Sequence, residues 1–288
     1  MALLKKIRKE MNKTLIPLRL SLTVPWRFRH FVRHPKPNPK LPVILTLTSY
    51  PKRFPSLHLT LQSLILQTPA AEQILLWIAP EDAVLLPKKV QNLIDQGWVK
   101  LCLTEDTRSY KKIIPSLIAY PEATLVTVDD DVYYPPEMLN TLYKMHLKFP
   151  NQVIANRTHC VIAGSEGTLA PYREWPKNQQ NPHCPQSNFQ TGIGGVLYPP
   201  AALHSKVTDA NEFLQLAPHG DDIWLYWMMR LNGRVALKTE NAFTFPSWLG
   251  SQKFALYKQN TRQNGNDPQI QAMLKRFGSP LAMPVTPS

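Results

Sequence analysis

The sequence predicts an α/β protein with a mostly parallel central sheet flanked by helices, preceded by a basic N-terminal arm. Short runs of branched apolar residues alternate with amphipathic segments over residues 43–128, as strands and helices do when they follow one another. Proline or glycine stands beside the ends of these amphipathic segments, as is usual at helix boundaries. The arm is indicated by charge, because residues 1–40 hold ten of the thirteen net positive charges.

Composition divides the chain into three parts. The 288 residues are enough to bury one large core or two small ones, and an apolar content of 43% is typical of a globular protein. Alternating prolines within residues 34–40 predict an extended linker after the arm. We therefore expect an arm and linker over residues 1–40, a single domain over residues 41–270 and a tail over residues 271–288.

The expected elements of the domain follow the order of a parallel sheet. Strands are predicted over four ranges, 43–48, 74–78, 99–103 and 125–128. Helices are predicted over three ranges, 56–67 with Ser56 as its cap, 87–96 closed by Gly97, and 113–120. Parallel strands joined by helices bind their ligands outside the carboxyl ends of the strands. A ligand site is therefore expected where these strands end.

An acidic run follows the fourth strand directly. Asp129, Asp130 and Asp131 repel one another, and a divalent cation would offset that repulsion. Carboxylate oxygens suit Mg²⁺ or Mn²⁺. Alternate residues of an extended chain point the same way, so Asp129 and Asp131 are the expected metal ligands. The alternative is an acidic loop that caps a helix beginning near Pro136.

Two further segments are expected at the same edge of the sheet. Lys111 and Lys112 begin a helix, where cations oppose the helix dipole, and a diphosphate between them and the metal would explain their position. A pair of solvated lysines is an equal alternative. The second segment is the loop after the first strand, which holds Thr48, Ser49, Tyr50 and Arg53.

A second acidic pair, Asp221 and Asp222, opens an amphipathic helix. Either carboxylate could act as a general base, and simple N-capping is the alternative. Trp224, on the same helix, is assigned mainly to the core, although aromatic rings also stack on ligands. Upstream, a glycine cluster precedes a β-like run and no helix, so it is not a dinucleotide fingerprint. Its glycines allow a ligand close to the backbone or form a tight turn: Gly192, Gly194 and Gly195.

These motifs together resemble a known family. The acidic run, the segment Ser109-Tyr-Lys-Lys112 and the segment Gly220-Asp-Asp-Ile-Trp224 are similar to those of bacterial glycosyltransferases with the A-type, nucleotide-diphospho-sugar transferase (GT-A) fold. More narrowly, they look like family-2-like enzymes of surface-polysaccharide biosynthesis. The resemblance covers about residues 42–270. It implies transfer of a sugar from a nucleotide-sugar donor to a glycan or lipid-linked glycan acceptor, with inversion expected and retention left open.

The resemblance also implies roles for the candidate residues. Asp129 and Asp131 would bind Mn²⁺ or Mg²⁺, and Asp221 or Asp222 would be the base. From their own residue types, the glycines and Trp224 are candidate substrate contacts, and the polar, asparagine-rich residues 253–267 are interpreted as a lid or acceptor loop. The donor nucleotide would lie against a larger set: Thr48, Ser49, Tyr50, Arg53, Lys111, Lys112, Asp129 and Asp130.

Three other functions are alternatives for this sequence. A nucleotidyltransferase could share the sheet and the metal, but residues 48–54 contain no glycine to cradle phosphates. A nucleic-acid-binding protein is disfavoured because the body is nearly neutral. A catalytically inactive homologue is disfavoured because the acidic residues are present.

The arm also bears on location. It lacks an uninterrupted apolar stretch and a cleavage site, so it is predicted to be neither a signal peptide nor a membrane span. Three cysteines that fit no zinc pattern indicate free thiols. We expect a cytoplasmic protein. The arm's mixture of aliphatic, aromatic and basic residues suits the anionic inner face of the cytoplasmic membrane, and a solvated arm packed on the body is the alternative.

Overall fold

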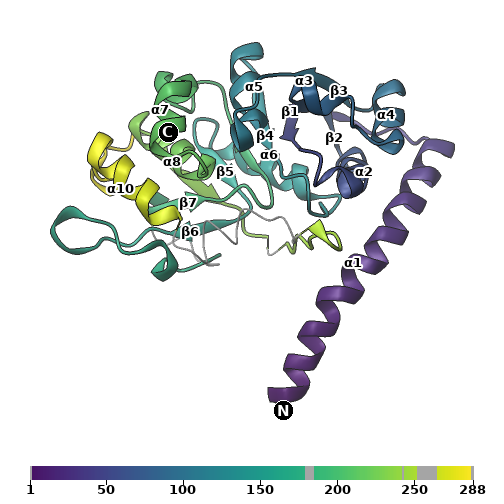
Figure 1. Ribbon diagram of the computed structural model, residues 1–288, viewed down its shortest axis with the longest axis horizontal. Coiled ribbons are helices and arrows are strands. Elements are labelled where there is room, and N and C mark those ends of the chain that lie inside the picture. The colour runs from purple at the N-terminus through teal and green to yellow at the C-terminus, as the bar shows by residue number, and fades with distance from the viewer. Residues whose placement is uncertain (1, 179–184, 242, 252–264, 287–288) are drawn as a thin grey trace.

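The computed structural model describes residues 2–178, 185–241, 243–251 and 265–286. Its central sheet has seven strands in the order β3-β2-β1-β4-β8-β5-β9, and β6 and β7 form a separate two-stranded sheet (Figure 1). Four of the six pairings in the central sheet are parallel, and β8 runs antiparallel to both of its neighbours. The expected α/β fold with a mostly parallel sheet is confirmed.

The first part of the domain alternates strands and helices. Its elements are β1 (Lys40–Thr48), α2 (Phe54–Ile65), β2 (Ala70–Ile78), α3 (Pro80–Ala83), α4 (Lys88–Asp95), β3 (Lys100–Leu103), the 3₁₀ helix η1 (Arg108–Lys112), α5 (Ile114–Ala119) and β4 (Thr124–Thr127). All four predicted strands and all three predicted helices are confirmed, with shifted bounds. The predicted cap is wrong, because α2 begins at Phe54 with Pro55 in its first turn, which places Ser56 inside the helix. Gly97 closes α4 as predicted, with a φ of 73°.

The second part contains shorter elements. They are α6 (Met138–Lys148), β5 (Val153–Ala155), β6 (Thr158–Cys160), η2 (Ser165–Gly167), η3 (Tyr172–Glu174), η4 (Pro185–Ser187), β7 (Asn188–Gln190), β8 (Val196–Tyr198), η5 (Ser205–Thr208), α7 (Ala210–Leu216), α8 (Asp221–Leu231), β9 (Ala236–Lys238), α10 (Asn266–Phe277) and η7 (Pro280–Ala282). The β-like run after Gly195 and the helix opened by Asp221 are confirmed as β8 and α8. The expected end of the domain at residue 270 falls inside α10, which packs on α8.

The core is divided by the sheet because alternate residues of a strand face opposite sides. In β1, Leu45 and Leu47 pack in one apolar cluster with residues of α2, α4 and α6. Ile44 packs on the other side, beside Leu117 of α5. A further large cluster is built on Trp224, Trp227 and their neighbours in α8, together with α7 and α10.

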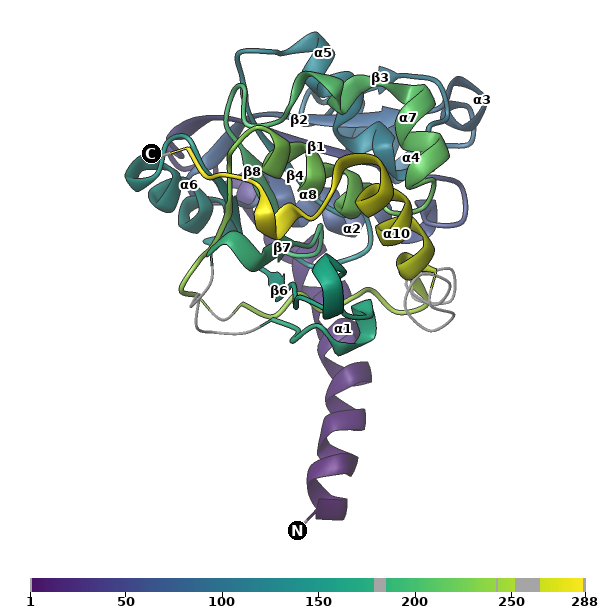
Figure 2. The same ribbon diagram turned by 90° about the vertical axis from the view of Figure 1, so that its left-hand side faces the viewer.

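The basic arm is a helix, α1 (Ala2–Arg33), for which no element was predicted. Its N-terminal half stands clear of the body in both views (Figures 1 and 2), and its C-terminal half packs on α2. No helix in the described parts of the chain is both long and apolar enough to cross a membrane. Two of the cysteines, Cys102 and Cys160, are free thiols.

Candidate active site

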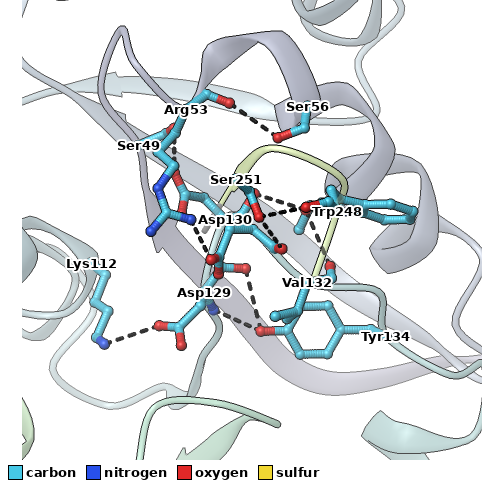
Figure 3. A network of polar contacts seen from close by, with 12 residues as sticks. Ser49, Arg53, Ser56, Lys112, Asp129, Asp130, Val132, Tyr134, Trp248 and Ser251 are labelled. Carbon is cyan, nitrogen blue, oxygen red and sulfur yellow. Dashed lines mark hydrogen bonds and ion pairs between the residues drawn. The ribbon is translucent and has the colours of Figure 1, made fainter. Parts of the chain in front are cut away.

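The acidic turn after β4 is held in place through its backbone (Figure 3). The buried phenol of Tyr134 accepts a hydrogen bond from the Asp129 N–H at 2.7 Å and donates one to the Asp129 carbonyl at 3.3 Å. The Thr60 hydroxyl, from α2, donates to the Asp130 carbonyl at 2.8 Å. These bonds satisfy backbone groups of the turn, so its carboxylates are left to pair with other side chains.

A segment from late in the chain, residues 245–251, closes the other side of the turn. The Trp248 N–H donates to the Asp131 carbonyl at 3.0 Å, and its indole N–H donates to the Thr60 hydroxyl at 2.7 Å. The Ser251 hydroxyl lies 3.4 Å from the Asp131 carbonyl oxygen. Trp248 is 2% exposed, and the sequence predicts no role for it because no local pattern links it to a turn so distant in the chain.

Two carboxylates of the turn share one arginine. We call this group the Arg53 cluster, and its members are Arg53, Asp130 and Asp131. The Arg53 guanidinium forms an ion pair with Asp131 and lies 3.9 Å from Asp130. The Ser49 hydroxyl donates to Asp130 at 2.5 Å. Burial opposes the charge on Arg53, but Asp131 and Asp130 together raise its pKa above the usual range. Burial and the charge of Asp131 raise the pKa of Asp130 to about 7, against the opposing effect of Arg53.

The third carboxylate of the turn, Asp129, points to a lysine. We call the group around this lysine the Lys112 cluster, and its members are Lys112, Asp129, Asp221 and Asp222. The Lys112 ammonium lies 2.7 Å from Asp221 and 3.3 Å from Asp129. Asp222 accepts a hydrogen bond from the Gly192 N–H at 3.0 Å. The predicted residues from four chain segments therefore meet at one place.

Gly192 lies at the centre of this meeting point. A methyl group at its α-carbon would lie 2.8 Å from the Lys112 Nζ, 3.1 Å from the Asp129 Oδ1 and 3.4 Å from the Asp222 Oδ1. The charged ends of three side chains thus surround a backbone position that has no side chain of its own. Glycine is required here for close approach of the charged groups.

Packing beneath the cluster fixes the position of Lys112. The Thr46 hydroxyl, from β1, donates to the Lys112 carbonyl at 2.6 Å. On the other side, the Tyr110 hydroxyl donates to the Ala217 carbonyl at 2.6 Å, just before α8. The Tyr110 ring also stacks on Phe213 with 4.0 Å between centroids. The 3₁₀ helix η1 is therefore tied both to the sheet and to the segment that presents Asp221 and Asp222.

The charges of the cluster depend on one another. Burial and the neighbouring Asp221 charge raise the pKa of Asp222 to about 7, while Lys112 opposes that rise. Burial opposes the charge on Lys112, but Asp221 and Asp129 hold its pKa well above the ordinary value. At neutral pH, Lys112 is thus a cation among carboxylates, and Asp222 can accept or release a proton.

Other predicted residues lie outside the two clusters. Lys111 is separated from Lys112 and pairs with Asp106 at 2.6 Å. The Thr48 hydroxyl donates to the carbonyl of Trp77 on the neighbouring strand, at 2.8 Å. Tyr50 accepts the Arg53 backbone N–H through its carbonyl at 2.8 Å. These three contacts shape the loop and η1, beside the charged groups.

Trp224 and two of the glycines have packing roles. Trp224 is fully buried in the α8 cluster and donates its indole N–H to the Val207 carbonyl at 3.0 Å, so the expected contact of its ring with substrate is not retained. Gly194 and Gly195 adopt φ values of 99° and 91°, which a side chain would strain. Gly194 faces Phe245, and Gly195 faces apolar side chains of α6. The expected lid over residues 253–267 lies mostly outside the described residues, which omit 252–264.

The donor chemistry of the acidic turn fits the expected divalent cation. Its side-chain donors are carboxylate oxygens, and burial raises the pKa of both Asp130 and Asp131, so a nearby positive charge would be favoured. Asp131 points to the Arg53 guanidinium, whereas Asp129 points to the Lys112 ammonium. Among the described residues, no group of three His, Cys, Asp or Glu side chains is arranged to hold a metal ion. Mg²⁺ bound with phosphates commonly uses one or two carboxylates. The turn can supply that number.

Comparison with known proteins identifies the fold. No family model and no curated protein matches the chain by sequence. A mannosyltransferase from Pyrobaculum calidifontis, solved with GDP-mannose and Mn²⁺, matches over 93% of this chain and 75% of its own, with 13% identity and a TM-score of 0.53. The chain therefore has the GT-A fold, as expected.

Two other solved structures align less closely. S. aureus TarS, residues 1–349, matches over 82% of this chain and 71% of its own, with 12% identity and a TM-score of 0.47. A 4-diphosphocytidyl-2C-methyl-D-erythritol synthase from Anaerococcus prevotii matches over 77% and 95%, with 14% identity and a TM-score of 0.45.

Proposed function

We propose that the protein is a metal-dependent glycosyltransferase that moves a sugar from a nucleotide-sugar donor to the hydroxyl of a glycan or lipid-linked glycan. The observation that supports this most directly is the convergence of Asp129, Lys112, Gly192 and Asp222 at the carboxyl edge of a GT-A sheet. A nucleotide-sugar transferase needs a diphosphate-binding edge and a proton acceptor beside it. The two clusters supply groups for both.

The Lys112 cluster suggests which carboxylate is the base. Asp221 lies 2.7 Å from the Lys112 ammonium, so its charge is largely offset. Asp222 has a pKa of about 7, raised by burial and by Asp221, and one of its oxygens is fixed by the Gly192 N–H. A base that ionises near the working pH combines a populated carboxylate with sufficient basicity. We therefore assign the base to Asp222 and a charge-balancing role to Asp221.

The proposed reaction is a single displacement with inversion. The Asp222 carboxylate takes the proton of the acceptor hydroxyl while the oxygen of that hydroxyl attacks the anomeric carbon of the donor sugar. The bond from that carbon to the donor phosphate breaks, and the nucleoside diphosphate leaves with the electron pair. Lys112 and Arg53 place positive charge at the edge where the diphosphate would lie.

The expected shared site at Asp129 and Asp131 is not formed, because Asp129 points to Lys112 and Asp131 points to Arg53. A cation bound with the donor phosphates would be held by one of these two carboxylates, while Ser49 keeps Asp130 on the side of Arg53. When bound, Mn²⁺ or Mg²⁺ supplies a Lewis acid that balances the charge of the departing diphosphate. The buried backbone bonds of Tyr134, Thr60 and Trp248 hold the turn that presents these carboxylates.

Nucleotide-dependent stabilisation tests this function. The melting temperature of the purified protein would be measured with uridine diphosphate, guanosine diphosphate and cytidine monophosphate, each with and without Mn²⁺. A nucleotide at one hundred times its dissociation constant stabilises the native state by about 2.7 kcal/mol, so a metal-dependent rise is expected for one nucleotide. Absence of any shift would contradict a donor site.

Analysis of products separates sugar transfer from nucleotidyl transfer. Incubation with a sugar donor that carries the stabilising nucleotide should release that nucleotide, and release of pyrophosphate in a nucleotidyl assay would favour the other class. Asp131→Asn should abolish release with the fold intact, as judged by its circular dichroism spectrum. Unchanged release by this variant would count against a metal site at the turn.

A further inference from the structure

The helix α1 has an inner face that packs on the body. Val24 is fully buried and belongs to a small apolar cluster with Leu59 and Trp248. One turn further on, Phe28 is 7% exposed and meets the ring of Trp98 edge-on, with 6.2 Å between centroids. The Arg27 guanidinium donates to the Tyr133 hydroxyl at 3.3 Å. Because residues 24, 27 and 28 share one side of a helix, these contacts fix the orientation of α1.

The outer face of α1 exposes large apolar side chains. Leu22 is 70% exposed and Trp26 is 65% exposed, although each is only two positions from the fully buried Val24. Leu15 and Leu18 are 51% and 46% exposed. Residues 15, 18, 22 and 26 are spaced by three or four, so they form one stripe on the side opposite Val24. Packing against the body does not account for this stripe, and contiguous exposed apolar surface usually marks an interaction site.

Positive charge accompanies the stripe. Arg19, Arg29 and Arg33 are exposed on the same helix. The first 40 residues hold eleven basic residues and one acidic residue, including five basic residues within the first 13 positions. The N-terminal half of the helix projects from the body in both views, so the body does not cover that half of the helix (Figures 1 and 2).

We propose that the outer face of α1, defined by Leu15, Leu18, Leu22 and Trp26 with the flanking arginines, binds the surface of an anionic lipid bilayer. Apolar side chains would enter the interface between headgroups and acyl chains, and the arginines would pair with lipid phosphates. A nucleic acid would neutralise the charges but leave Leu22 and Trp26 in water. A second copy of the chain would cover apolar surface but bring an equally basic helix alongside.

The inner face of α1 contacts the segment that supports the acidic turn. Val24 packs with Trp248, whose backbone N–H donates to the Asp131 carbonyl and whose indole donates to Thr60. Attachment through the outer face would therefore leave the inner contacts of α1 intact. Bilayer binding is independent of sugar transfer, so failure of one proposal does not imply failure of the other.

Vesicle sedimentation with the full-length protein tests the proposal. The vesicles would be phosphatidylcholine alone, and phosphatidylcholine mixed with phosphatidylglycerol. The protein should sediment with the mixed vesicles and not with the neutral ones, and added salt should weaken the binding. The double variant Leu22→Ser/Trp26→Ser should bind at least about tenfold more weakly, because the side chains it removes would be buried in the interface. Arg29→Gln and Arg33→Gln should each weaken binding about fivefold.

Matched controls keep the test specific. Ile118→Ser changes an apolar residue that is 66% exposed on the body, and it should bind vesicles like the wild type. Because Leu22 and Trp26 are exposed, the double variant should keep the wild-type melting temperature. Equal binding of the double variant and the wild type would overturn the proposal. The proposal would also be overturned if the wild type did not bind vesicles but formed a dimer or an RNA complex that the double variant does not form.

Discussion

The Arg53 cluster and the Lys112 cluster both hold carboxylates of the same acidic turn, and they differ in where their partners come from. Arg53 pairs with Asp130 and Asp131, which are adjacent in the chain. Lys112 joins Asp129 to Asp221, which lies on a different part of the fold. A guanidinium forms a rigid, permanently charged pair, whereas an ammonium is a point charge that several groups can share. The comparison suggests that Arg53 secures the turn and that Lys112 couples the turn to the proposed base.

The largest expected effect distinguishes the two carboxylates of α8. Asp222→Asn should lower kcat/KM by about 10²- to 10⁴-fold, because it removes the proton acceptor. Asp221→Asn should have a smaller effect, because Lys112 already offsets that charge at 2.7 Å. The measurement is release of nucleoside diphosphate in the presence of acceptor. A greater loss in Asp221→Asn would reverse the assignment.

The second prediction separates the two cations. Lys112→Met and Arg53→Met should each lower the free energy of unfolding by about 3–5 kcal/mol, because each leaves buried carboxylates without their partner. Only Lys112→Met should move the acid limb of activity to higher pH, because Lys112 lowers the pKa of Asp222. Urea unfolding and pH–rate profiles check this. An equal displacement of the limb in Arg53→Met would show that the clusters are not distinct.

The third prediction concerns the space between the charged groups. The new methyl group of Gly192→Ala would lie within 3.4 Å of Lys112, Asp129 and Asp222, all at flexible ends of side chains. Displacement of reacting groups by about 1 Å costs up to about 10²-fold in rate, while the fold should tolerate the change. Gly194→Ala is the contrasting variant. Because residue 194 has a φ of 99°, a side chain there should lower the stability of the fold before it affects the charged groups. Wild-type activity in a folded Gly192→Ala variant would remove this glycine from the site.

The last prediction is a pH dependence of stability. The pKa of Asp222 is raised to about 7, so the folded state favours its protonated form, and this stabilisation is lost as pH rises from about 4 through about 7. Each unit of pKa difference corresponds to about 1.4 kcal/mol. Burial lowers the pKa of His58 and of His159 to about 4, which gives the opposite slope below pH 6.5. The difference between wild type and Asp222→Asn isolates the carboxyl.

Unfolding in urea at pH 5 and pH 8 provides that comparison. Asp222→Asn should gain stability relative to the wild type as pH rises, since it has no buried carboxylate to ionise. A difference that stays constant with pH would mean that Asp222 ionises in the folded state as it does in water.

Much of the first half of the fold follows from local sequence. Branched apolar runs gave the positions of β1 to β4, and Pro55 and Gly97 lie at helix ends for reasons of backbone geometry. The three-residue strands β5 and β9 could not be predicted, because three residues are too few to show an alternation. The helix α1 was not predicted because Pro17 and Pro25 interrupt its pattern.

The sequence by itself determined the candidates for the chemistry: the acidic turn after an apolar strand, the lysine pair, the glycines and the acidic pair that opens α8. Only the tertiary structure decided which of them meet. In the folded chain, Lys112 contacts Asp129 and Asp221, whereas Lys111 pairs with Asp106. Trp224 is buried, and Trp248 packs against the acidic turn. Spacing along a chain fixes the face and edge a residue occupies, whereas contacts between distant segments depend on how sheet, helices and loops pack together.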